Sequence, residues 1–588
     1  MNQPLKCAAV AGTLLLAVNP KAATPSAPLH ESTPHPRRGH AVACTRSPAV
    51  PRAPQFSLSP GHTGDDTCAI QAAVDAALKV SLDGKFVITA PIELPAGTTV
   101  EGVSGTTEIT QQAEADVFRV TGNLDRSNDS VTFVDSVHVT GLHFVGHRDD
   151  FAALRVSLGR HITFDHNTAD RIGLVTVTVD PHGSVQRGNP RPFNPVSFDV
   201  TITDNRGTGT YCYSGSDSRE NAILLSSVDS ASVARNNISF YSNGIEWWGG
   251  NADPDRSKGG EGFLDENGDA VFNEMLARNI HIVADTIMNT KNGIWGSMGD
   301  AITVDGNQVY YCVDVCLDAE GSSNVHFSHN QAGYARIGSV LSVFFYSTDV
   351  TFEFNDVFQT GMGPGMQTHA AGGKDYCVLF ASHNPQSYQA NIRIYLQNNT
   401  FRFDAGPFAT CPVGFVLKES SRYFEFDANT LHDVVLDLRP KYNGAVFVGY
   451  NSLTFSRSTA GLAAVSVAHN YGRKADVSDA ITADVVHAGS RHQVDIRNNN
   501  ISSPGVPQDT AAGIMVSEGD PSETSLDEVG KDESTWIHLN GIGDFSRSIF
   551  AEWNGKVHYC LTHNVPTGTV TVFERPIPNV TPQPVQCH

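Results

Sequence analysis

The sequence predicts an all-β chain that winds as a single parallel β-helix, a solenoid whose coils add strands to the same few sheets. Two observations predict this fold. An Asn recurs about every two dozen residues, and short runs of Val, Ile, Phe and Thr are separated by Gly, Asn, Asp and Ser. Helical periodicity is missing across the same region. The period is too short for a strand plus a helix, so one solenoid coil accounts for it best.

The first element expected is a signal peptide over residues 1–27. This stretch has a weakly positive start, a short apolar run and then small residues, with cleavage expected between Ala23 and Ala27. A disordered apolar tail is the alternative. Residues 28–55 are rich in Pro, Ser, His and Arg and are expected to form a disordered linker. No later apolar run reaches the roughly 18 residues that span a bilayer, so the sequence predicts a secreted or periplasmic protein without a membrane span.

The next element expected is a short helix that covers one end of the solenoid. "GDDTCAIQAAVDAALK", residues 64–79, reads as an amphipathic helix, and residues 84–105 follow with strands and Pro-Gly turns. This pairing resembles the start of right-handed parallel β-helix proteins of the pectate-lyase-like superfamily, in which a helix caps the open end. The resemblance covers about residues 56–501. It does not imply one chemistry, because that superfamily includes hydrolases, lyases, epimerases and phage tailspikes.

The solenoid itself is predicted over residues 56–503, followed by a C-terminal cap or tail over residues 504–588. Intervals of 23, 25 and 22 residues separate the cleanest repeats, Asn307 to Asn330, Asn330 to Asn355 and Asn429 to Asn451. Asn at a solenoid corner can stack as a ladder and tolerates the left-handed backbone of a tight turn. The other Asn residues expected at this corner are Asn167, Asn205, Asn237, Asn399 and Asn499.

The charge of the chain limits the classes of partner. It has 588 residues, and 62 acidic against 40 basic residues give a net charge of −22. Nucleic-acid binders need a basic surface, which this composition argues against. Tight binding of polyanionic polysaccharides is also disfavoured unless a local basic strip overrides the mean charge. The partner expected is a polysaccharide or an oligosaccharide, and the oligomeric state stays open.

The cysteines are expected to form disulfides, as in other exported chains. Ten are present, and nine remain after the signal peptide, so at least one thiol is left unpaired. Plausible bridges are Cys377 with Cys411 and Cys560 with Cys587. Cys312 and Cys316 have no His or Cys partners at zinc-site spacing, so a zinc site is not expected.

Stacking the coils on their Asn residues places acidic side chains in one column. Counting back 12 residues from Asn307, Asn330 and Asn355 reaches Trp295, Asp318 and Val343. The motif "NGIEWW" matches the later "NGIW" and brings Glu246 into the same column. Because strand residues alternate between faces, Ile245, Ile294 and Leu317 should point inward and the column outward.

Two carboxylates at this spacing predict a glycosidase site. Glu246 and Asp318 lie two strands apart, about 9 to 10 Å at the backbone, and inverting glycosidases hold their carboxyl groups roughly 6.5 to 9.5 Å apart. We expect Glu246 to be the acid, because Trp residues make its surroundings apolar. Glu320 is a third catalytic candidate that could orient water. The alternative is that the acids are ordinary solvated surface groups.

Aromatic and polar neighbours complete the expected substrate surface. Trp and Tyr rings can stack on the C–H face of a sugar. Trp247 and Trp248 are adjacent in sequence, so only one of them can point outward. The substrate-binding candidates are Trp295, Trp248, Trp247, Ser297 and Asp300.

No cofactor is expected, with Ca²⁺ as the open alternative. The long loop over residues 249–279 contains acidic and amide side chains that resemble a Ca²⁺ cluster but lack the closing Glu of an EF-hand. These side chains are Asp253, Asp255, Asp265, Asn267 and Asp269.

Two other functions compete with a hydrolase. A uronate lyase or C5-epimerase would need a cation and a base, with Lys374, His369, Lys418 or Arg439 as candidates. "VDPHGS", residues 179–184, resembles the Asp-Pro-His motif of alginate epimerases, whereas the motifs of polygalacturonases are not recognisable. A non-catalytic, tailspike-like glycan-binding protein would use the Trp residues alone.

Overall fold

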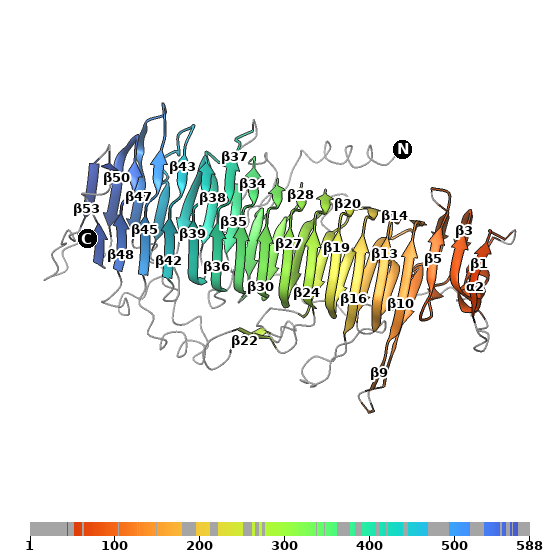
Figure 1. Cartoon of the computed structure of the whole chain (residues 1–588). Coiled ribbons are helices and arrows are strands. Elements are labelled where there is room, and N and C mark those ends of the chain that lie inside the picture. The colour runs from red at the N-terminus through yellow and green to blue at the C-terminus, as the bar shows by residue number, and fades with distance from the viewer. Residues whose placement is uncertain are drawn as a thin grey trace, which may run out of the picture.

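Three long parallel sheets of 17, 16 and 16 strands form the molecule, here called sheets A, B and C (Figure 1). The computed structural model describes Cys44 and, with gaps, residues 52–573. The gaps of four or more residues are 179–195, 212–220, 251–261, 265–269, 273–276, 361–376, 383–390, 407–410, 439–444, 469–492, 518–533 and 560–564. Each coil runs through sheets A, B and C in that order and pairs with the coils before and after it. The parallel β-helix predicted from the sequence is therefore confirmed.

The strands of sheet A are β1 (Ala53–Leu58), β2 (Ala77–Leu82), β5 (Thr99–Gly102), β10 (Val134–Thr140), β13 (Gly159–Asp165), β16 (Ser197–Thr203), β19 (Val228–Ala234), β24 (Ala277–Val283), β27 (Gly299–Asp305), β30 (Ser323–Ser328), β33 (Thr348–Glu353), β36 (Asn391–Gln397), β39 (Ser421–Asp427), β42 (Ala445–Gly449), β45 (Gln493–Arg497), β48 (Ser534–His538) and β51 (Lys556–Tyr559).

The strands of sheet B are β3 (Lys85–Ile88), β6 (Glu108–Gln111), β11 (His143–Val145), β14 (Thr168–Asp170), β17 (Arg206–Thr208), β20 (Asn237–Ser239), β25 (Thr286–Met288), β28 (Gln308–Tyr310), β31 (Gln331–Gly333), β34 (Asp356–Gln359), β37 (Thr400–Phe403), β40 (Thr430–His432), β43 (Ser452–Thr454), β46 (Asn500–Ser502), β49 (Gly541–Ile542) and β52 (Val565–Pro566).

The strands of sheet C are β4 (Ile92–Glu93), β7 (Phe118–Thr121), β12 (Ala152–Ser157), β15 (Gly173–Thr178), β18 (Asn221–Ser226), β21 (Asn243–Trp248), β26 (Asn292–Ser297), β29 (Leu317–Glu320), β32 (Leu341–Phe344), β35 (Val378–Ser382), β38 (Gly414–Lys418), β41 (Val434–Leu438), β44 (Val465–Ala468), β47 (Gln508–Ser517), β50 (Phe545–Glu552) and β53 (Thr569–Phe573).

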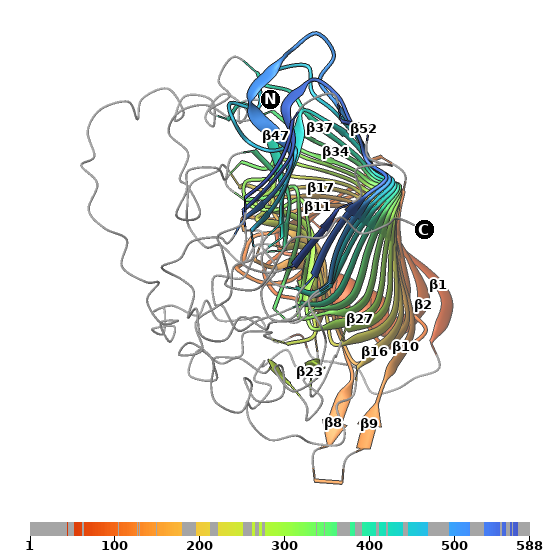
Figure 2. The ribbon, with the colours of Figure 1, turned by 90° about the vertical axis from the view of Figure 1, so that its left-hand side faces the viewer.

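Two antiparallel hairpins stand apart from the stack: β8 (Asn123–Asp125) with β9 (Ser130–Thr132), and β22 (Gly262–Leu264) with β23 (Ala270–Phe272). The end-on view shows the strands of each sheet superposed along the solenoid and the hairpin of β8 and β9 projecting from it (Figure 2).

Asparagine side chains stack at the corner between sheets A and B and tie the coils together. At Asn307 the side-chain Nδ2 donates to the Oδ1 of Asn330 at 3.0 Å, and the backbone N donates to the same oxygen at 2.9 Å. The same pattern links Asn330 to Asn355. The predicted ladder is confirmed. The residue in the left-handed backbone region, however, is the one before each ladder Asn, such as His329 with φ 53°.

Three ladder positions differ from the prediction, and one of them is Asn540, which continues the ladder after Asn499. Asn236, not Asn237, occupies the ladder, because it directly follows the left-handed Arg235, whereas Asn237 starts β20 with an exposed side chain. The sequence reading also missed Asp285, which takes the next ladder position.

Asp285 replaces an amide by a carboxyl group inside the ladder. Its Oδ1 accepts bonds from the backbone N and the Nδ2 of Asn236, as an Asn side chain would. Its Oδ2 stands where neighbouring positions carry an NH₂ group and has no hydrogen-bond partner in the described part of the chain. Burial raises the pKa of Asp285 to about 7. A protonated Oδ2 can donate in place of the missing amide.

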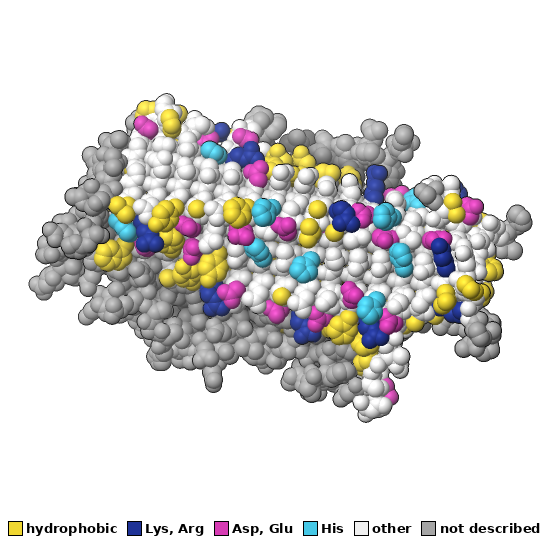
Figure 3. All heavy atoms as spheres, viewed as in Figure 1, with side chains coloured by type: hydrophobic (Ala, Val, Ile, Leu, Met, Phe, Trp, Pro, Cys, Tyr) yellow, Lys and Arg dark blue, Asp and Glu magenta, His cyan; other side chains and the backbone are white. Residues whose placement is uncertain are grey.

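Charged side chains on the outer face of sheet A are paired at the surface. Arg235 binds Asp204 through two hydrogen bonds of 2.8 and 2.6 Å, and His326 contacts Glu353 at 2.8 Å. Such pairs recur along this face, where Asp, Glu, His and Arg side chains lie among uncharged ones (Figure 3). Exposed pairs of this kind contribute about 0 to 1 kcal/mol each, so they mainly keep the face solvated.

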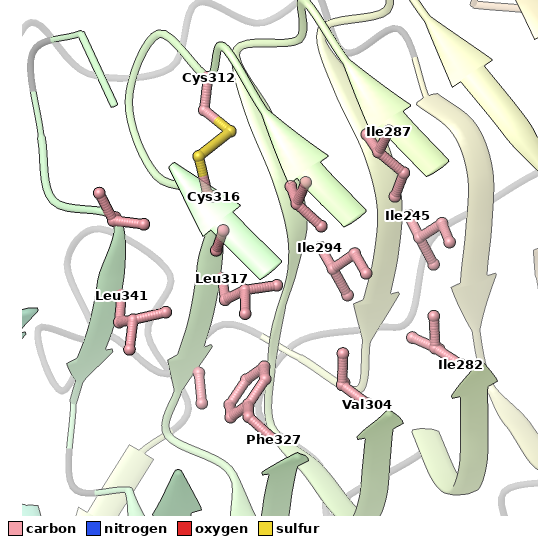
Figure 4. Close-up of a cluster of buried hydrophobic side chains, with 14 of the residues drawn as sticks. Ile245, Ile282, Ile287, Ile294, Val304, Cys312, Cys316, Leu317, Phe327 and Leu341 are labelled. Carbon is pink, nitrogen blue, oxygen red and sulfur yellow. A yellow bond between two sulfur atoms is a disulfide. The ribbon is translucent and has the colours of Figure 1, made fainter. Parts of the chain in front are cut away.

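The interior is a set of aliphatic and aromatic stacks. Ile245, Ile294, Leu317 and Leu341 occupy matching positions on β21, β26, β29 and β32, and all four are fully buried. The close-up shows them pointing into the same space, toward sheet A (Figure 4). The inward orientation predicted for the first three is confirmed. Truncating one such residue to Ala typically costs about 2 to 5 kcal/mol.

The helix α2 (Thr67–Ala76) lies at the N-terminal end, as predicted, although it ends three residues earlier because Ala77 begins β2. Asp66 ties the helix start to sheet B by accepting a 3.0 Å bond from the backbone N of Val87. Arg52 caps the other end, donating to the carbonyl oxygens of Val74 and Ala77. These buried polar contacts fix the helix over the first coil.

The solenoid extends beyond the predicted boundary at residue 503. Strands β47, β50 and β53 continue sheet C, and β48 and β51 continue sheet A. The strands within the predicted C-terminal cap therefore continue the same stacking. The predicted signal peptide lies outside the described residues.

Three disulfides are present in the described part of the chain: Cys44–Cys68, Cys312–Cys316 and Cys377–Cys411. The third confirms a predicted bridge. Cys560 and Cys587 lie outside the described residues. Among the helices that the structure describes, none is long and apolar enough to cross a membrane.

Candidate functional site

Glu246, Trp295 and Asp318 lie side by side on three neighbouring strands of sheet C, β21, β26 and β29. We call these three residues the acid column, and their predicted stacking is confirmed. The next position holds Ser342 rather than Val343. The prediction of Val343 is wrong because the turn after β32 has three residues, whereas the turn after β29 has two.

The two acids of the column are on the outer face of the sheet yet are buried, whereas Trp295 between them is partly exposed. Glu246 is 7% exposed and Asp318 is 2% exposed. Burying a carboxylate is costly unless hydrogen bonds or charges compensate, and the acids of sheet A avoid that cost by staying at the surface. Carboxyl groups kept in such surroundings are frequent at functional sites.

Asp318 has the properties of a proton donor. Burial raises its pKa to about 7; the nearby Ser342 hydroxyl and the Ala319 amide oppose the rise, and the charge of Asp314 adds to it. Its Oδ1 has no hydrogen-bond partner among the described residues. The carboxyl group can therefore be protonated near neutral pH and present one oxygen to a ligand.

Glu246 differs from Asp318 because its carboxyl group accepts a hydrogen bond from a neighbouring side chain. Asn243, on the same strand, donates from Nδ2 to the Glu246 Oε2 at 2.9 Å. The same Nδ2 also donates to Asn221 Oδ1 at 2.6 Å, and Asn292 Nδ2 donates to Asn243 Oδ1 at 2.8 Å. Glu246 accepts this bond as an ionised carboxylate does.

Two indole rings line the outer face beside the acids. The Trp248 and Trp295 rings meet edge to face, with centroids 6.2 Å apart and planes at 67°. The Trp295 Nε1 is buried and has no hydrogen-bond partner among the described residues. Both rings keep partial solvent exposure, so they can contact a ligand that also reaches the column.

Trp247 does not belong to this surface, and its expected role in substrate binding is wrong. It is fully buried, and its Nε1 donates to Ser322 Oγ at 3.2 Å. The ring fits inside the narrow coil because its neighbours Gly296 and Gly299 have no side chains; a Cβ on either would lie within 2.6 Å of the ring.

The remaining site residues expected from the sequence lie on two different sheets, C and A. Ser297 and Glu320 follow Trp248 in the next outward column, on β26 and β29. Asp300 is on β27 in sheet A, where it accepts bonds from Ser323 and Asn324 at 2.6 and 2.8 Å. The structure therefore does not bring Asp300 to the acid column, because the turn at Met298 separates the two faces.

The candidates for uronate chemistry are not assembled beside the column. Lys418 shares the inward position of Leu438 and is buried, so the expectation of a substrate-facing Lys418 is wrong. In the described part of the chain, no group of His, Cys, Asp or Glu side chains is arranged to hold a metal ion. Outside the described residues lie Lys374, His369, Arg439, residues 179–184 and the acidic cluster at Asp253, Asp255, Asp265, Asn267 and Asp269.

The sequence reading missed the side chains that surround the two acids. Asn243 and Asn292 both begin the repeated motif Asn-Gly-Ile at the start of a sheet C strand, and this repetition was the available signal. Ser342 was hidden by the extra turn residue. No sequence pattern pointed to Asp314, which comes close to Asp318 through the fold of the short segment closed by the Cys312–Cys316 disulfide.

Comparisons with known proteins add no family assignment. No family model and no curated protein matches the chain. Among solved structures, the A-module of the mannuronan C-5 epimerase AlgE6 from Azotobacter vinelandii is 11% identical, with 87% of this chain and 96% of that one covered and a TM-score of 0.34. The tailspike protein of E. coli bacteriophage HK620, solved with a pentasaccharide, is 10% identical over 83% and 76%, with a TM-score of 0.42. PfbA, a surface adhesin of Streptococcus pneumoniae, is 14% identical over 84% and 93%, with a TM-score of 0.33.

Proposed function

We propose that this protein is an exported glycoside hydrolase that cleaves a poly- or oligosaccharide lying over the outer face of sheet C, with Asp318 as the general acid and Glu246 as the general base. One observation carries the proposal. Two buried carboxyl groups, two strands apart in one column, have opposite hydrogen-bond environments. Pairs of acids whose surroundings differ in this way divide acid and base roles between them.

In the proposed reaction Asp318 donates its proton to the glycosidic oxygen while the bond from that oxygen to the anomeric carbon breaks. A pKa of about 7 keeps the acid form populated at neutral pH. Its Oδ1, unpartnered among the described residues, is the atom available to the leaving oxygen. This reverses the role expected from the sequence, in which the Trp residues pointed to Glu246 as the acid.

Glu246 takes a proton from a water molecule, and the water oxygen forms the new bond to the anomeric carbon. Two strand spacings separate the acids by about 9 to 10 Å at the backbone, which leaves room for a water between the carboxyl groups, as inverting glycosidases require. The bond that Oε2 accepts from Asn243 holds the Glu246 carboxyl group in place for this step. The reaction leaves Glu246 protonated and Asp318 ionised, and proton exchange with solvent restores both groups before the next turnover.

The aromatic and acidic surroundings favour an uncharged sugar. Trp295 lies between the two acids and Trp248 meets it edge to face, so a sugar ring can rest against indole carbon while its hydroxyl groups reach the carboxyls. The column and the neighbouring Glu320 and Asp314 are acidic. A uronate carboxylate placed there would be repelled unless residues beyond the described part supply a cation.

The test is to incubate the purified protein with a polysaccharide panel and to follow reducing ends and absorbance at 235 nm together, with and without EDTA. We expect new reducing ends without absorbance, indifferent to EDTA, and a loss of at least about 100-fold in Glu246→Gln and Asp318→Asn. Glu353→Gln on sheet A is the matched control and should keep full activity. Absorbance that EDTA abolishes would instead identify a uronate lyase.

A further inference from the structure

Three asparagines on the outer edge of sheet C form a second row, distinct from the ladder at the corner between sheets A and B. Asn221, Asn243 and Asn292 occupy matching positions on β18, β21 and β26. Asn292 Nδ2 donates to Asn243 Oδ1 at 2.8 Å, and Asn243 Nδ2 donates to Asn221 Oδ1 at 2.6 Å. We call these residues the asparagine row.

The asparagine row differs from the ladder in its second acceptor. In the ladder, each Nδ2 donates to the next side chain and to a backbone carbonyl, as Asn307 does to Ile282. In the row, Asn243 Nδ2 donates instead to the carboxylate of Glu246 at 2.9 Å. A row that served only to join coils would not need a carboxylate, because a backbone carbonyl satisfies the same NH₂ group elsewhere in this molecule.

We infer that Asn243 is a positioning residue for Glu246 and that Asn292, which donates to Asn243 Oδ1, sets the orientation of the Asn243 amide. The inference rests on the proposed function, since it explains how one acid of the pair is kept as a hydrogen-bond acceptor. It adds the row to the residues that govern the reaction.

The direction of the row follows from the chemistry of the groups. An amide has one donor end and one acceptor end, whereas an ionised carboxylate only accepts. With Asn292 donating to its Oδ1, Asn243 must turn its NH₂ end toward Glu246. If Asn292 became an acceptor, the Asn243 amide would be drawn to flip, and its carbonyl oxygen would face Glu246. That arrangement favours the protonated form of the carboxyl group.

Two substitutions separate the effect of hydrogen-bond direction from the effect of an added negative charge. In the wild type, Asn292 donates to Asn243. Asn292→Asp replaces this donor by an acceptor and therefore reverses the direction of the hydrogen bonds along the row. Asn221→Asp adds the same charge one strand away on the other side of Asn243, but at a position that already accepts. The two variants thus place the same extra charge one strand from Asn243 while only the first changes the direction of the hydrogen bonds.

The readout is the ionisation of Glu246, measured by NMR on protein labelled with ¹³C at the Glu side-chain carboxyl. The Glu246 signal is identified by its loss in Glu246→Gln. We expect its titration midpoint to lie at least one pH unit higher in Asn292→Asp than in Asn221→Asp. Equal midpoints in the two variants would overturn the inference, because they would show that charge alone acts on Glu246.

Hydrolysis by the wild type on the polysaccharide panel tests the proposed function separately, because the titration requires no substrate. On a substrate that is cleaved, Asn292→Asp should lower kcat/KM about tenfold on the acid side of its pH profile and leave the alkaline side unchanged. A uniform loss at every pH, with equal thermal destabilisation in both variants, would show a structural role and would contradict the inference.

Discussion

Asp318 and Glu246 carry the same chemical group in different surroundings, and that difference sets the pH range in which the site should work. Asp318 is buried with one oxygen unpartnered among the described residues, whereas Glu246 accepts a bond from Asn243. The acid must hold its proton and the base must have lost its own.

Activity is therefore expected to fall as the pH rises through about 7, the value to which burial raises the pKa of Asp318. Above that pH, kcat/KM should decrease about tenfold per pH unit, because the active fraction is the protonated one. The measurement is a pH–rate profile on a cleaved substrate. Ser342→Ala removes a hydroxyl that lowers the pKa of Asp318, so the alkaline limb should move to higher pH in this variant; an unmoved limb would speak against Asp318 as the acid.

Asp285 makes a second prediction at the residue scale, about stability. Its pKa is raised in the folded state to about 7, whereas an Asp in an unfolded chain has a pKa of about 3.9. The folded state therefore binds this proton more tightly, so the contribution of Asp285 to stability is fully present below about pH 4 and is lost as the pH rises through about 7. The slope is at most about 1.4 kcal/mol per pH unit.

Asp285→Asn restores the regular ladder and should remove the part of the pH dependence that Asp285 contributes, raising the free energy of unfolding by roughly 2 kcal/mol at pH 8. Urea unfolding at several pH values measures the effect. The matched variant Asn330→Asp should introduce a similar slope at another ladder position. If Asp285→Asn were no more stable than the wild type at pH 8, ionisation of Asp285 would not destabilise the folded state.

At the scale of single elements, the alternation of strand residues predicted side-chain orientation best. The lengths of local turns were the hardest feature to predict. Alternation on β21 already places Glu246 outward and Trp247 inward, opposite Gly296, so the burial of Trp247 could have been predicted. The extra residue in the turn after β32 could not, because turn lengths are set by local backbone geometry that short polar sequences do not specify. For the same reason Ser342 was missed.

The close packing of the Trp247 ring against Gly296 predicts that a side chain at this glycine destabilises the fold. A Cβ at Gly296 would lie 2.3 Å from the Trp247 ring, so Gly296→Ala should destabilise the fold by about 1 to 3 kcal/mol through overpacking. Urea unfolding measures the loss. Gly543→Ala, where a Cβ would meet nothing within 4 Å, should change stability by less than about 0.5 kcal/mol. Equal effects at the two sites would contradict the packing account.

At the scale of the whole molecule, the repeat made the architecture predictable. Each coil buries its apolar residues only against its neighbours, so periodic Asn and alternating strands report the fold directly. The end of the solenoid was placed too early, since strands β47 to β53 follow segments that interrupt the period. Side chains that meet across coils, such as Asn243 with Asn292 or Asp318 with Ser342, depend on three-dimensional register and needed the structure.

The central claim is that two acids, two strands apart on sheet C, act as acid and base on either side of a sugar with a water between them. The most direct measurement is the anomeric configuration of the first product, followed by ¹H NMR on a substrate that the panel identifies. The spacing predicts inversion at the anomeric carbon. Retention, or an unsaturated product, would contradict the account.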